Sequence, residues 1–151
     1  MGHPFDPQRV LQKPLMATLG TIAADGSPRT APVWYHWEAD ALHMLGSDTG
    51  SSSQRILADP RVSVEITDYD NAAGRLLHLG LRGRAEIIPM DGDLFRRLLD
   101  RYLGARETWN AWFIDTIAAI DDPSGRLIRL VPQSVFTNNV SYFRTGPDFA
   151  A

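Results

Sequence analysis

The N-terminal half of the chain has the alternating pattern of a β-hairpin. Residues 15–23 are apolar, small or β-branched, residues 24–27 (Ala-Asp-Gly-Ser) supply a turn, and residues 29–37 resume an extended pattern. Alternation with a period of two is typical of a half-buried strand, and the composition of the turn favours a tight reversal. The pattern therefore predicts two antiparallel strands joined by a short turn.

The second strand of this hairpin carries aromatic residues on both faces. Because successive side chains of a strand point to opposite faces, Val33, Tyr35 and Trp37 share one face, and Trp34 and His36 share the other. A strand face that contacts only solvent is polar, and neither face of this strand is. We therefore expect one face in the core and the other against a partner or a ligand.

Further strands follow along the chain. Their composition is rich in β-branched and apolar residues, and their ranges are 41–46, 61–67, 75–88 and 126–131, the last extended by residues 135–136. Gly80 and Gly83 within the longest of them predict β-bulges, where a strand bends. With the hairpin, this pattern predicts a mainly β protein with flanking helices.

Two longer segments have a helical period. Asp91 is the predicted N-cap of a helix whose apolar stripe ends at Gly104, and a second helix is predicted over residues 108–120. We expect the first to cover one side of the sheet. Trp109 and Trp112 on the second have two interpretations, as core residues or as rings that reach across a dimer toward a cofactor.

The ends of the chain and one connection complete the expected elements. Residues 1–14 form a lead-in in which Asp6 and the following proline start a short helix that Pro14 ends. Another short helix is expected over residues 52–58, and the tail 146–151 is expected to be disordered.

Length and charge limit the classes of function. A chain of 151 residues is one domain by size, so we expect residues 1–151 to form a single domain. A net charge of −3 with scattered basic residues excludes an electrostatic footprint for nucleic acid. No apolar run is long enough for a membrane span or a signal peptide, so we expect no membrane partner and a cytoplasmic location. The absence of cysteine excludes disulfides, Fe–S ligation and a thiol nucleophile.

Residues 47–53 form a loop rich in hydroxyl groups, Ser-Asp-Thr-Gly-Ser-Ser-Ser, which leads into the short helix. Two interpretations fit it, capping of that helix and a site where hydroxyl and helix N–H groups hold a phosphate without a metal. Lys13 is the only lysine, so any anion site must use arginine, hydroxyls or backbone N–H groups. The four histidines have no metal-ligand spacing, and no metal site is predicted.

Three motifs occur in order: the hairpin DGSPRTAPVWYHW, the loop GSDTGSSS, and RILADPRVSV, in which Asp-Pro-Arg-Val opens a strand. Together they resemble the split-barrel flavin-binding proteins of the pyridoxamine 5′-phosphate oxidase-like family. The resemblance covers about the first half of the chain. It implies a six-stranded antiparallel split β-barrel and a homodimer with FMN at its interface.

The resemblance also implies which residues hold the cofactor. The strand that faces the flavin ring matches Thr30, Ala31, Pro32, Val33 and Trp34. The loop that faces the phosphate matches Ser47, Asp48, Thr49, Ser51, Ser52 and Ser53. Backbone groups of a strand can hydrogen-bond the polar edge of a flavin, while hydroxyls and helix N–H groups hold the phosphate.

The sequence departs from the family pattern in the phosphate loop. The usual lysine falls at Ser52, or at Ser53 if the loop carries an insertion, and neither residue is charged. A missing charged hydrogen bond costs about 1.5–3 kcal/mol when nothing replaces it. The nearest substitute is Arg55, one turn into the helix, and neighbouring strands offer Arg29, Arg82 and Arg84.

Several functions follow as hypotheses. The first is an FMN-dependent oxidoreductase that transfers a hydride through a non-covalently bound flavin to a small-molecule substrate, with no side chain assigned as catalytic because the cofactor carries the chemistry. The second is a non-catalytic store or sensor of flavin or haem, with His36 or His43 as the haem ligand and His36 as a pocket residue. The third is an F420-dependent reductase, ranked lower because the anionic F420 tail normally meets more basic residues. The last is a barrel without a cofactor.

Overall fold

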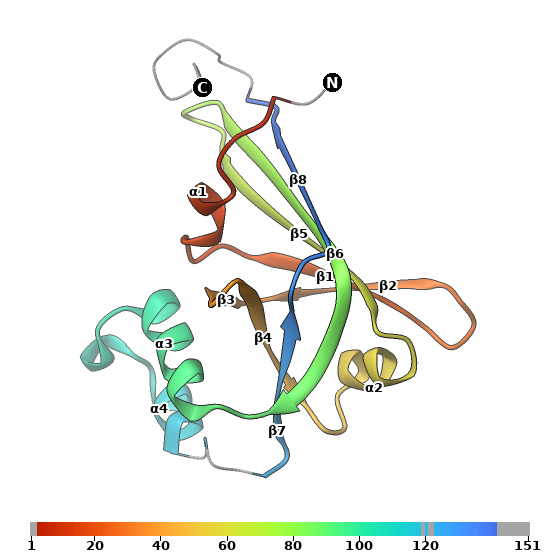
Figure 1. Ribbon diagram of the computed structural model, residues 1–151. Helices are drawn as coiled ribbons and strands as arrows, with labels where there is room; N and C mark the ends of the chain where they lie inside the picture. The colour runs from red at the N-terminus through yellow and green to blue at the C-terminus, as the bar shows by residue number, and fades with distance from the viewer. Residues whose placement is uncertain (1–2, 119, 121–122, 142–151) are drawn as a thin grey trace.

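The computed structural model describes residues 3–118, 120 and 123–141, whose strands form one strongly curled antiparallel sheet with helices around it (Figure 1). The strands are β1 (Ala17–Ile22), β2 (Pro28–Val33), β3 (Tyr35–Glu38), β4 (Ala41–Ser47), β5 (Arg61–Asp70), β6 (Arg75–Pro89), β7 (Gly125–Leu130) and β8 (Ser134–Asn139). The helices are α1 (Gln8–Leu11), α2 (Ser51–Ala58), α3 (Gly92–Leu103) and α4 (Ala111–Ala118), with a 3₁₀ turn at Arg106–Thr108. The mainly β class predicted from the sequence is confirmed.

The sheet is a barrel that remains open on one side. Its strand order is β2-β1-β5-β6-β7-β4-β3, and β8 pairs with β6 beside this path. Within the described residues the two end strands, β2 and β3, do not pair with each other, although one residue alone separates them in the chain. The opening of the split barrel therefore lies at Trp34.

The six expected strands become eight because two of them are interrupted. The expected strand 29–37 breaks at Trp34, where the chain leaves β2, paired with β1, and enters β3, paired with β4. The closing strand breaks around Pro132, which separates β7 from β8. Proline cannot donate a ladder hydrogen bond, so the break at this position has a local cause.

Gly83 of β6 serves a close approach, and neither Gly80 nor Gly83 forms the predicted bulge. The register of β5 against β6 runs unbroken from Arg61↔Arg84 to Asp70↔Arg75, so the predicted bulges at Gly80 and Gly83 are absent. At Gly83, β6 changes its second partner from β8 to β7. A Cβ atom on Gly83 would lie 3.2 Å from the carbonyl oxygen of Val131, so a larger residue would push the β7–β8 connection away.

The inner faces of the strands form the main core. Tyr35 is fully buried in it, and Val33 and Trp37 pack against it, while Trp34 packs in a second cluster with α3. The two-faced strand predicted from alternation is thus confirmed. The second face meets helices of the same chain, which the sequence pattern did not identify.

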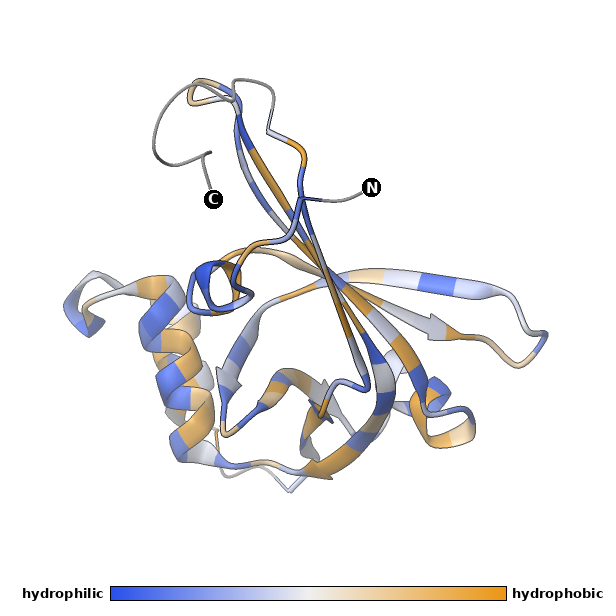
Figure 2. Ribbon diagram, turned by 45° about the horizontal axis from the view of Figure 1, so that its top comes forward, coloured by the Kyte–Doolittle hydropathy of each residue, from blue (hydrophilic) through white to orange (hydrophobic). Residues whose placement is uncertain are grey.

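Helix α3 has the predicted boundaries. The Asp91 carboxylate accepts hydrogen bonds from the backbone N–H groups of Asp93 and Leu94, and the helix ends at Gly104, whose φ is 72°. Figure 2 shows apolar and charged residues alternating along α3, as an amphipathic helix requires. The second predicted helix, 108–120, is shorter, because the 3₁₀ turn precedes it and α4 covers only Ala111–Ala118. No helix of the described residues is long and apolar enough to cross a membrane.

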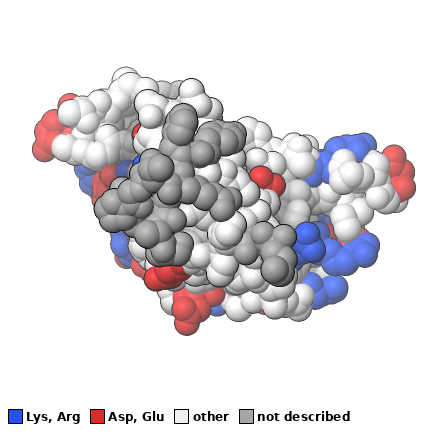
Figure 3. Space-filling model, turned by 90° about the horizontal axis from the view of Figure 1, so that it is seen from above, with Lys and Arg blue, Asp and Glu red and all other residues white. Residues whose placement is uncertain are grey.

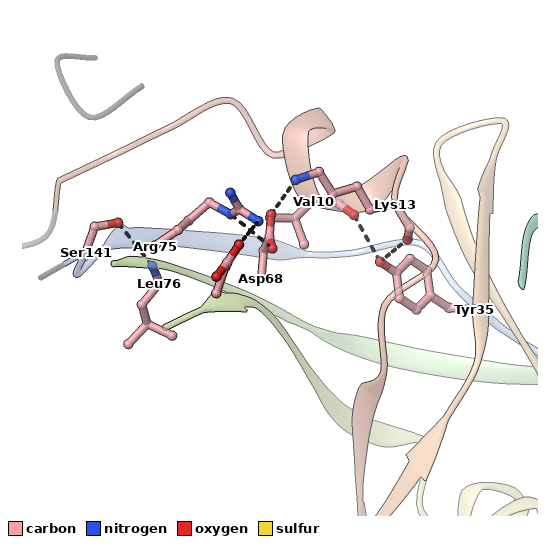
Figure 4. A network of polar contacts seen from close by, with 8 residues as sticks. Val10, Lys13, Tyr35, Asp68, Arg75, Leu76 and Ser141 are labelled. Carbon is pink, nitrogen blue, oxygen red and sulfur yellow. Dashed lines mark hydrogen bonds and ion pairs between the residues drawn. The ribbon is translucent and has the colours of Figure 1, made fainter. Parts of the chain in front are cut away.

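The N-terminal lead-in is tied to the barrel by a polar network (Figure 4). Helix α1 begins at Gln8, later than predicted, and the Asp6 carboxylate accepts from the Gln8 N–H. Lys13 pairs with the buried carboxylate of Asp68, which also lies 3.3 Å from Nε of Arg75. The Tyr35 hydroxyl meets the carbonyls of Val10 and Lys13 at 3.0 and 2.7 Å. The tail predicted to be disordered lies outside the described residues.

One hydroxyl joins three segments at the opening of the barrel. The Tyr35 N–H donates to the Tyr102 hydroxyl at 3.0 Å, and that hydroxyl donates to the Leu15 carbonyl at 2.6 Å. The Tyr102 ring stacks on Trp34 with centroids 4.5 Å apart. Helix α3 is therefore fixed at the point where the chain passes from β2 to β3.

The Tyr102→Phe variant is expected to lower the free energy of unfolding by about 1–3 kcal/mol, because it leaves a part-buried N–H and a carbonyl without their partner. Urea denaturation monitored by tryptophan fluorescence measures the change. Tyr69→Phe is the matched control, because Tyr69 is exposed. Equal effects of the two variants would contradict the proposed role of the Tyr102 hydroxyl.

Candidate functional site

An apolar hollow of about 400 Å³ lies at the opening of the barrel, between the strands and the helices α3 and α4. On the strand side it is lined by Met16, Pro32, Val33, Trp34 and Leu45. On the helix side it is lined by Phe95, Leu98, Leu99, Trp112, Phe113 and Thr116. We call it the apolar chamber. Its volume lies in the range of about 300–1,000 Å³ that is typical of small-molecule sites.

A second hollow of about 350 Å³ adjoins the chamber at Leu45, which lines both. Its other lining residues are Gly46, Ser47, Gly50, Ser51, Ser52, Ser53 and Ile128. We call it the hydroxyl compartment, and the two together the groove. Strand β4 builds this junction, because Leu45, Gly46 and Ser47 are its last residues.

The hydroxyl compartment contains the N-terminus of α2. The N-cap is Gly50, and no side chain of the described residues caps this end, so the predicted capping by loop hydroxyls is wrong. The Ser53 side chain is buried, with 1% of the residue exposed, and its hydroxyl has no hydrogen-bond partner among the described residues. A Cβ on Gly46 would lie 2.8 Å from Ser53 Oγ, so glycine is the residue that leaves room beside it. Free helix N–H groups and an unused hydroxyl suit an anion.

The groove brings together seven of the twelve residues expected to hold the cofactor. Pro32, Val33 and Trp34 line the chamber, and Ser47, Ser51, Ser52 and Ser53 line the hydroxyl compartment. The remaining expected residues, Thr30, Ala31, Asp48, Thr49 and Arg55, line neither part. Asp48 has a backbone role instead, because its carbonyl accepts from the Gln54 side chain and its N–H donates to Ser124.

Arg55 lies beside the hydroxyl compartment. Its Nε donates to Thr21 Oγ1 at 2.8 Å, and its Nη2 lies 3.5 Å from Ser52 Oγ. Figure 3 shows basic side chains gathered at the end of the molecule that carries the β1–β2 hairpin, and Arg55 and Arg61 line a hollow between this hairpin and α2. Of the arginines suggested as substitutes for the missing lysine, Arg55 is the one in contact with a serine of the loop.

Strand β2 offers an open edge next to the chamber, because among the strands of the described residues it pairs only with β1. Proline has no N–H to donate into a ladder, so Pro28 and Pro32 fit an orientation in which their backbone nitrogens face the open edge. Thr30 shares their orientation, because backbone groups alternate along a strand. Its N–H is then the donor that this edge presents.

The Trp34 ring is packed into the wall of the chamber and does not project into it as an isolated side chain. Its ring stacks on Tyr102 of α3 and, at 5.7 Å between centroids, on Phe113 of α4. Trp112 meets Phe113 edge to face and is 66% exposed at the chamber mouth. Trp109 is buried in the second cluster, which fits its interpretation as a core residue.

The α3 residues of the chamber were not predicted as site residues, whereas Trp112 of α4 was one of the two rings considered for a contact with a cofactor. Phe95, Leu98 and Leu99 belong to the amphipathic stripe of α3, and such a stripe indicates burial without specifying whether protein or ligand covers it. No signal in the sequence distinguishes the two cases.

The histidines considered as haem ligands lie away from the groove, under α3. His36 Nδ1 is 3.2 Å from Nη1 of Arg101, and its Nε2 is 3.5 Å from the Glu38 carboxylate. A guanidinium can only donate, so Nδ1 of His36 accepts and is unprotonated. His43 is buried, and its Nδ1 has no partner within the described chain. Neither ring lines the chamber or the hydroxyl compartment, so the expectation that His36 lines the pocket is wrong.

Comparisons with known proteins are consistent with this geometry. The family model described as pyridoxamine 5′-phosphate oxidase matches residues 8–139. A solved structure named F420 reductase has 26% sequence identity and a TM-score of 0.68, covering 89% of this chain and 98% of that chain. A comparison with curated protein sequences gives no match.

Two further solved structures share the fold. A conserved hypothetical protein from Mycobacterium tuberculosis has 18% identity and a TM-score of 0.72, covering 99% of this chain and 96% of that chain. The haem storage protein HutZ from Vibrio cholerae has 17% identity and a TM-score of 0.65, covering 87% of this chain and 91% of that chain. At these identities the likeness concerns the fold alone.

The two histidines under α3 are expected to make stability depend on pH. Burial lowers the pKa of both, and the Arg101 charge lowers that of His36 further. As the pH falls through about 6.5, these histidines are protonated in the unfolded chain but stay neutral in the folded chain. The free energy of unfolding therefore keeps its full value above this pH and decreases as the pH falls through it. Urea unfolding at about pH 7.5 and about pH 5.5 measures the loss.

The control is the double variant His36→Gln/His43→Gln. Arg97, Arg101 and Glu38 around His36, and Arg129 beside His43, remain in it, as do all carboxylates that titrate at lower pH. Its stability is expected to fall less between the two pH values. An equal fall in both proteins would contradict the assignment to these histidines.

Proposed function

The chain belongs to the pyridoxamine 5′-phosphate oxidase family, and from this premise we propose that it is an oxidoreductase that binds FMN in the groove. The observation that carries the proposal is the buried Ser53 hydroxyl, which has no hydrogen-bond partner in the described part of the chain and lies at the N-terminus of α2, next to an apolar chamber. A buried polar group without a partner is costly, and a bound phosphate oxygen would give it one.

The residues of the groove fit the parts of this cofactor. Ser51, Ser52 and Ser53, with the N–H groups of α2, would hold the phosphate, and Arg55 would add a positive charge beside it. The open edge of β2, with the Thr30 N–H, would meet the polar edge of the ring. When bound, a flavin supplies hydride transfer, and the protein contributes orientation and the exclusion of water.

F420 is the second candidate cofactor, for two reasons. The solved structure named F420 reductase is 26% identical over most of the chain. In addition, no charged side chain of the described residues lines the hydroxyl compartment. A phosphodiester, as in F420, carries one negative charge, whereas the phosphomonoester of FMN carries about −1.5 to −2 near neutral pH. An uncharged compartment therefore fits the diester itself at a smaller electrostatic cost, whereas the rest of the anionic F420 tail still requires basic residues, so F420 stays below FMN.

Titration of the purified protein with FMN and with F420, followed by tryptophan fluorescence, tests the proposal. FMN is expected to bind with a dissociation constant in the micromolar range, or about 8 kcal/mol of binding free energy. F420 binding about tenfold tighter or more would replace FMN as the cofactor. Binding of neither at about millimolar concentration would overturn the proposal.

Two variants test the phosphate residues. Ser53→Ala is expected to weaken cofactor binding about three- to tenfold, and Arg55→Ala about tenfold or more. Unfolding free energies are expected to change little for Ser53→Ala, because the hydroxyl makes no hydrogen bond in the described structure. Ser134→Ala and Arg61→Ala are the controls, because Ser134 is exposed on β8 and Arg61 pairs with Asp59. Unchanged affinity would remove the substituted residue from the site.

We further propose that the protein acts as a homodimer through the outer face of β1, β5, β6 and β8. Phe136 on β8 is 52% exposed and borders a hollow of about 320 Å³ in this face. Exposed apolar side chains beside a hollow are typical of a protein interface.

Light scattering at about micromolar concentration is expected to give the mass of a dimer, and Phe136→Asp is expected to give the monomer, since it places a charge in the interface. Leu57→Asp on α2, whose leucine is 62% exposed, is the control and should remain dimeric. A monomeric parent protein would contradict the proposal.

A further inference from the structure

Helix α4 is apolar on nearly all of its sides, yet much of it is exposed. Asp115 is the one charged residue in its sequence. Trp112 and Ile114 are more than half exposed, and Figure 1 shows α4 at the periphery of the molecule, next to α3. A helix without a polar face normally lies inside a protein, where other elements cover it. The apolar surface of α4 is therefore larger than the surface that the described elements cover.

The contacts that attach α4 to the rest of the molecule are apolar. Within the described residues its hydrogen bonds stay inside the helix or reach Asn110 before it and Ile120 after it. Phe113 stacks on Trp34, and Ile117 packs against the second cluster, the one that contains α3. No hydrogen bond or ion pair between described residues joins α4 to a strand.

Helix α3, by contrast, is attached by polar side chains. It donates hydrogen bonds to β3 and to the N-terminal segment through Arg97, Arg101 and Tyr102. Helix α4 has only eight residues, and several of them are β-branched or aromatic. Helices this short are not stable alone, and such residues lower the helix propensity further. Of the two helices that line the chamber, α4 is therefore the one that separates from it at the lower free-energy cost.

The two ends of the segment that contains α4 are fixed. Trp109, before the helix, is buried, and its Nε1 donates to the Gly104 carbonyl at 2.9 Å. Ile120, after the helix, is buried in the same cluster. A segment that is fixed at both ends and loosely packed between them can move as a unit over a site.

The mouth of the chamber is open and has apolar side chains on both of its sides. Trp112 lines the chamber from α4, while Met16 and Leu45, which are 55% and 48% exposed, line it from the strands. Burial of exposed apolar surface is favourable. Movement of α4 toward Met16 and Leu45, with a ligand between them, would bury all three side chains.

We propose that α4 is a lid on the groove and that Trp112 is the side chain that closes over the bound cofactor. The identity of the enclosed ligand rests on the proposed function, in which FMN occupies the groove. Closing would exclude water from the flavin ring, where hydride transfer takes place. The exposed Trp112 ring would then pack against the cofactor, as aromatic side chains do in binding sites.

Double electron–electron resonance between two spin labels measures the movement. The chain has no cysteine, so Ile114→Cys and Leu57→Cys supply the attachment sites, both exposed and neither lining the groove. The distance distribution between α4 and α2 is expected to be broad in the free protein. Saturating FMN is expected to narrow it and to shift it to shorter distances. The control pair, Asp93→Cys with Leu57→Cys, reports on α3 at an exposed position and is expected to stay narrow in both states.

The free protein separates this inference from the proposed function. Failure to bind both FMN and F420 would overturn the proposed function, and the lid would then be judged without ligand. A distribution for α4 broader than that for α3 would support the lid, and equally narrow distributions would overturn it. If FMN binds and leaves the α4 distribution unchanged, the lid is overturned and the proposed function stands.

The dissociation rate of FMN, followed by stopped-flow flavin fluorescence, tests the role of Trp112. Trp112→Ala is expected to raise this rate about tenfold or more, and Ile114→Ala less than about twofold. Ile114 is the matched control because it is an exposed apolar residue of the same helix that does not line the chamber. Equal rates in the two variants would overturn the role of Trp112. Loss of the dimer in Trp112→Ala, measured by light scattering, would assign this face of α4 to a subunit contact and overturn the lid.

Discussion

The Tyr102 hydroxyl is the contact on which the opening of this barrel depends. At Trp34 the chain leaves the half of the sheet that contains β1 and β2 and enters the half that contains β3 and β4. The Tyr35 N–H would be left without a ladder partner there, and Tyr102 accepts it while donating to Leu15. Because a part-buried backbone group needs a partner, this bond fixes α3 against the break. Trp34, whose ring stacks on Tyr102, then forms part of the wall of the apolar chamber.

The groove separates two kinds of chemistry along one strand. At Leu45, β4 faces apolar rings, and at Ser47 it leads into serine hydroxyls and the start of α2. A ligand with an apolar part and an anionic part fits such a surface, since each part meets a matching environment. The polar network around Asp68 lies on the other side of Tyr35 and holds the N-terminal segment there, away from the groove (Figure 4).

The missing lysine of the phosphate loop changes the electrostatics of this end. Hydroxyl and N–H donors hold an anion through directed hydrogen bonds, whereas a lysine adds a full charge. The Arg55 guanidinium contacts Ser52 and also donates a hydrogen bond to Thr21. Its positive charge therefore lies beside the compartment and not within its lining. The charge of the phosphate group that each candidate cofactor would bring to this compartment is thus the property that distinguishes the candidates.

The sequence by itself determined the mainly β class, the helix from Asp91 to Gly104 and the two faces of the strand around Tyr35, because alternation, capping and glycine stops are local signals. It also identified the serines near α2. Only the tertiary structure decided that the strand breaks at Trp34, that the loop hydroxyls leave α2 uncapped, and that Phe95, Leu98 and Trp112 line a hollow. An apolar stripe has the same sequence pattern whether it meets a core or a ligand, and what it meets depends on contacts between residues far apart in the chain.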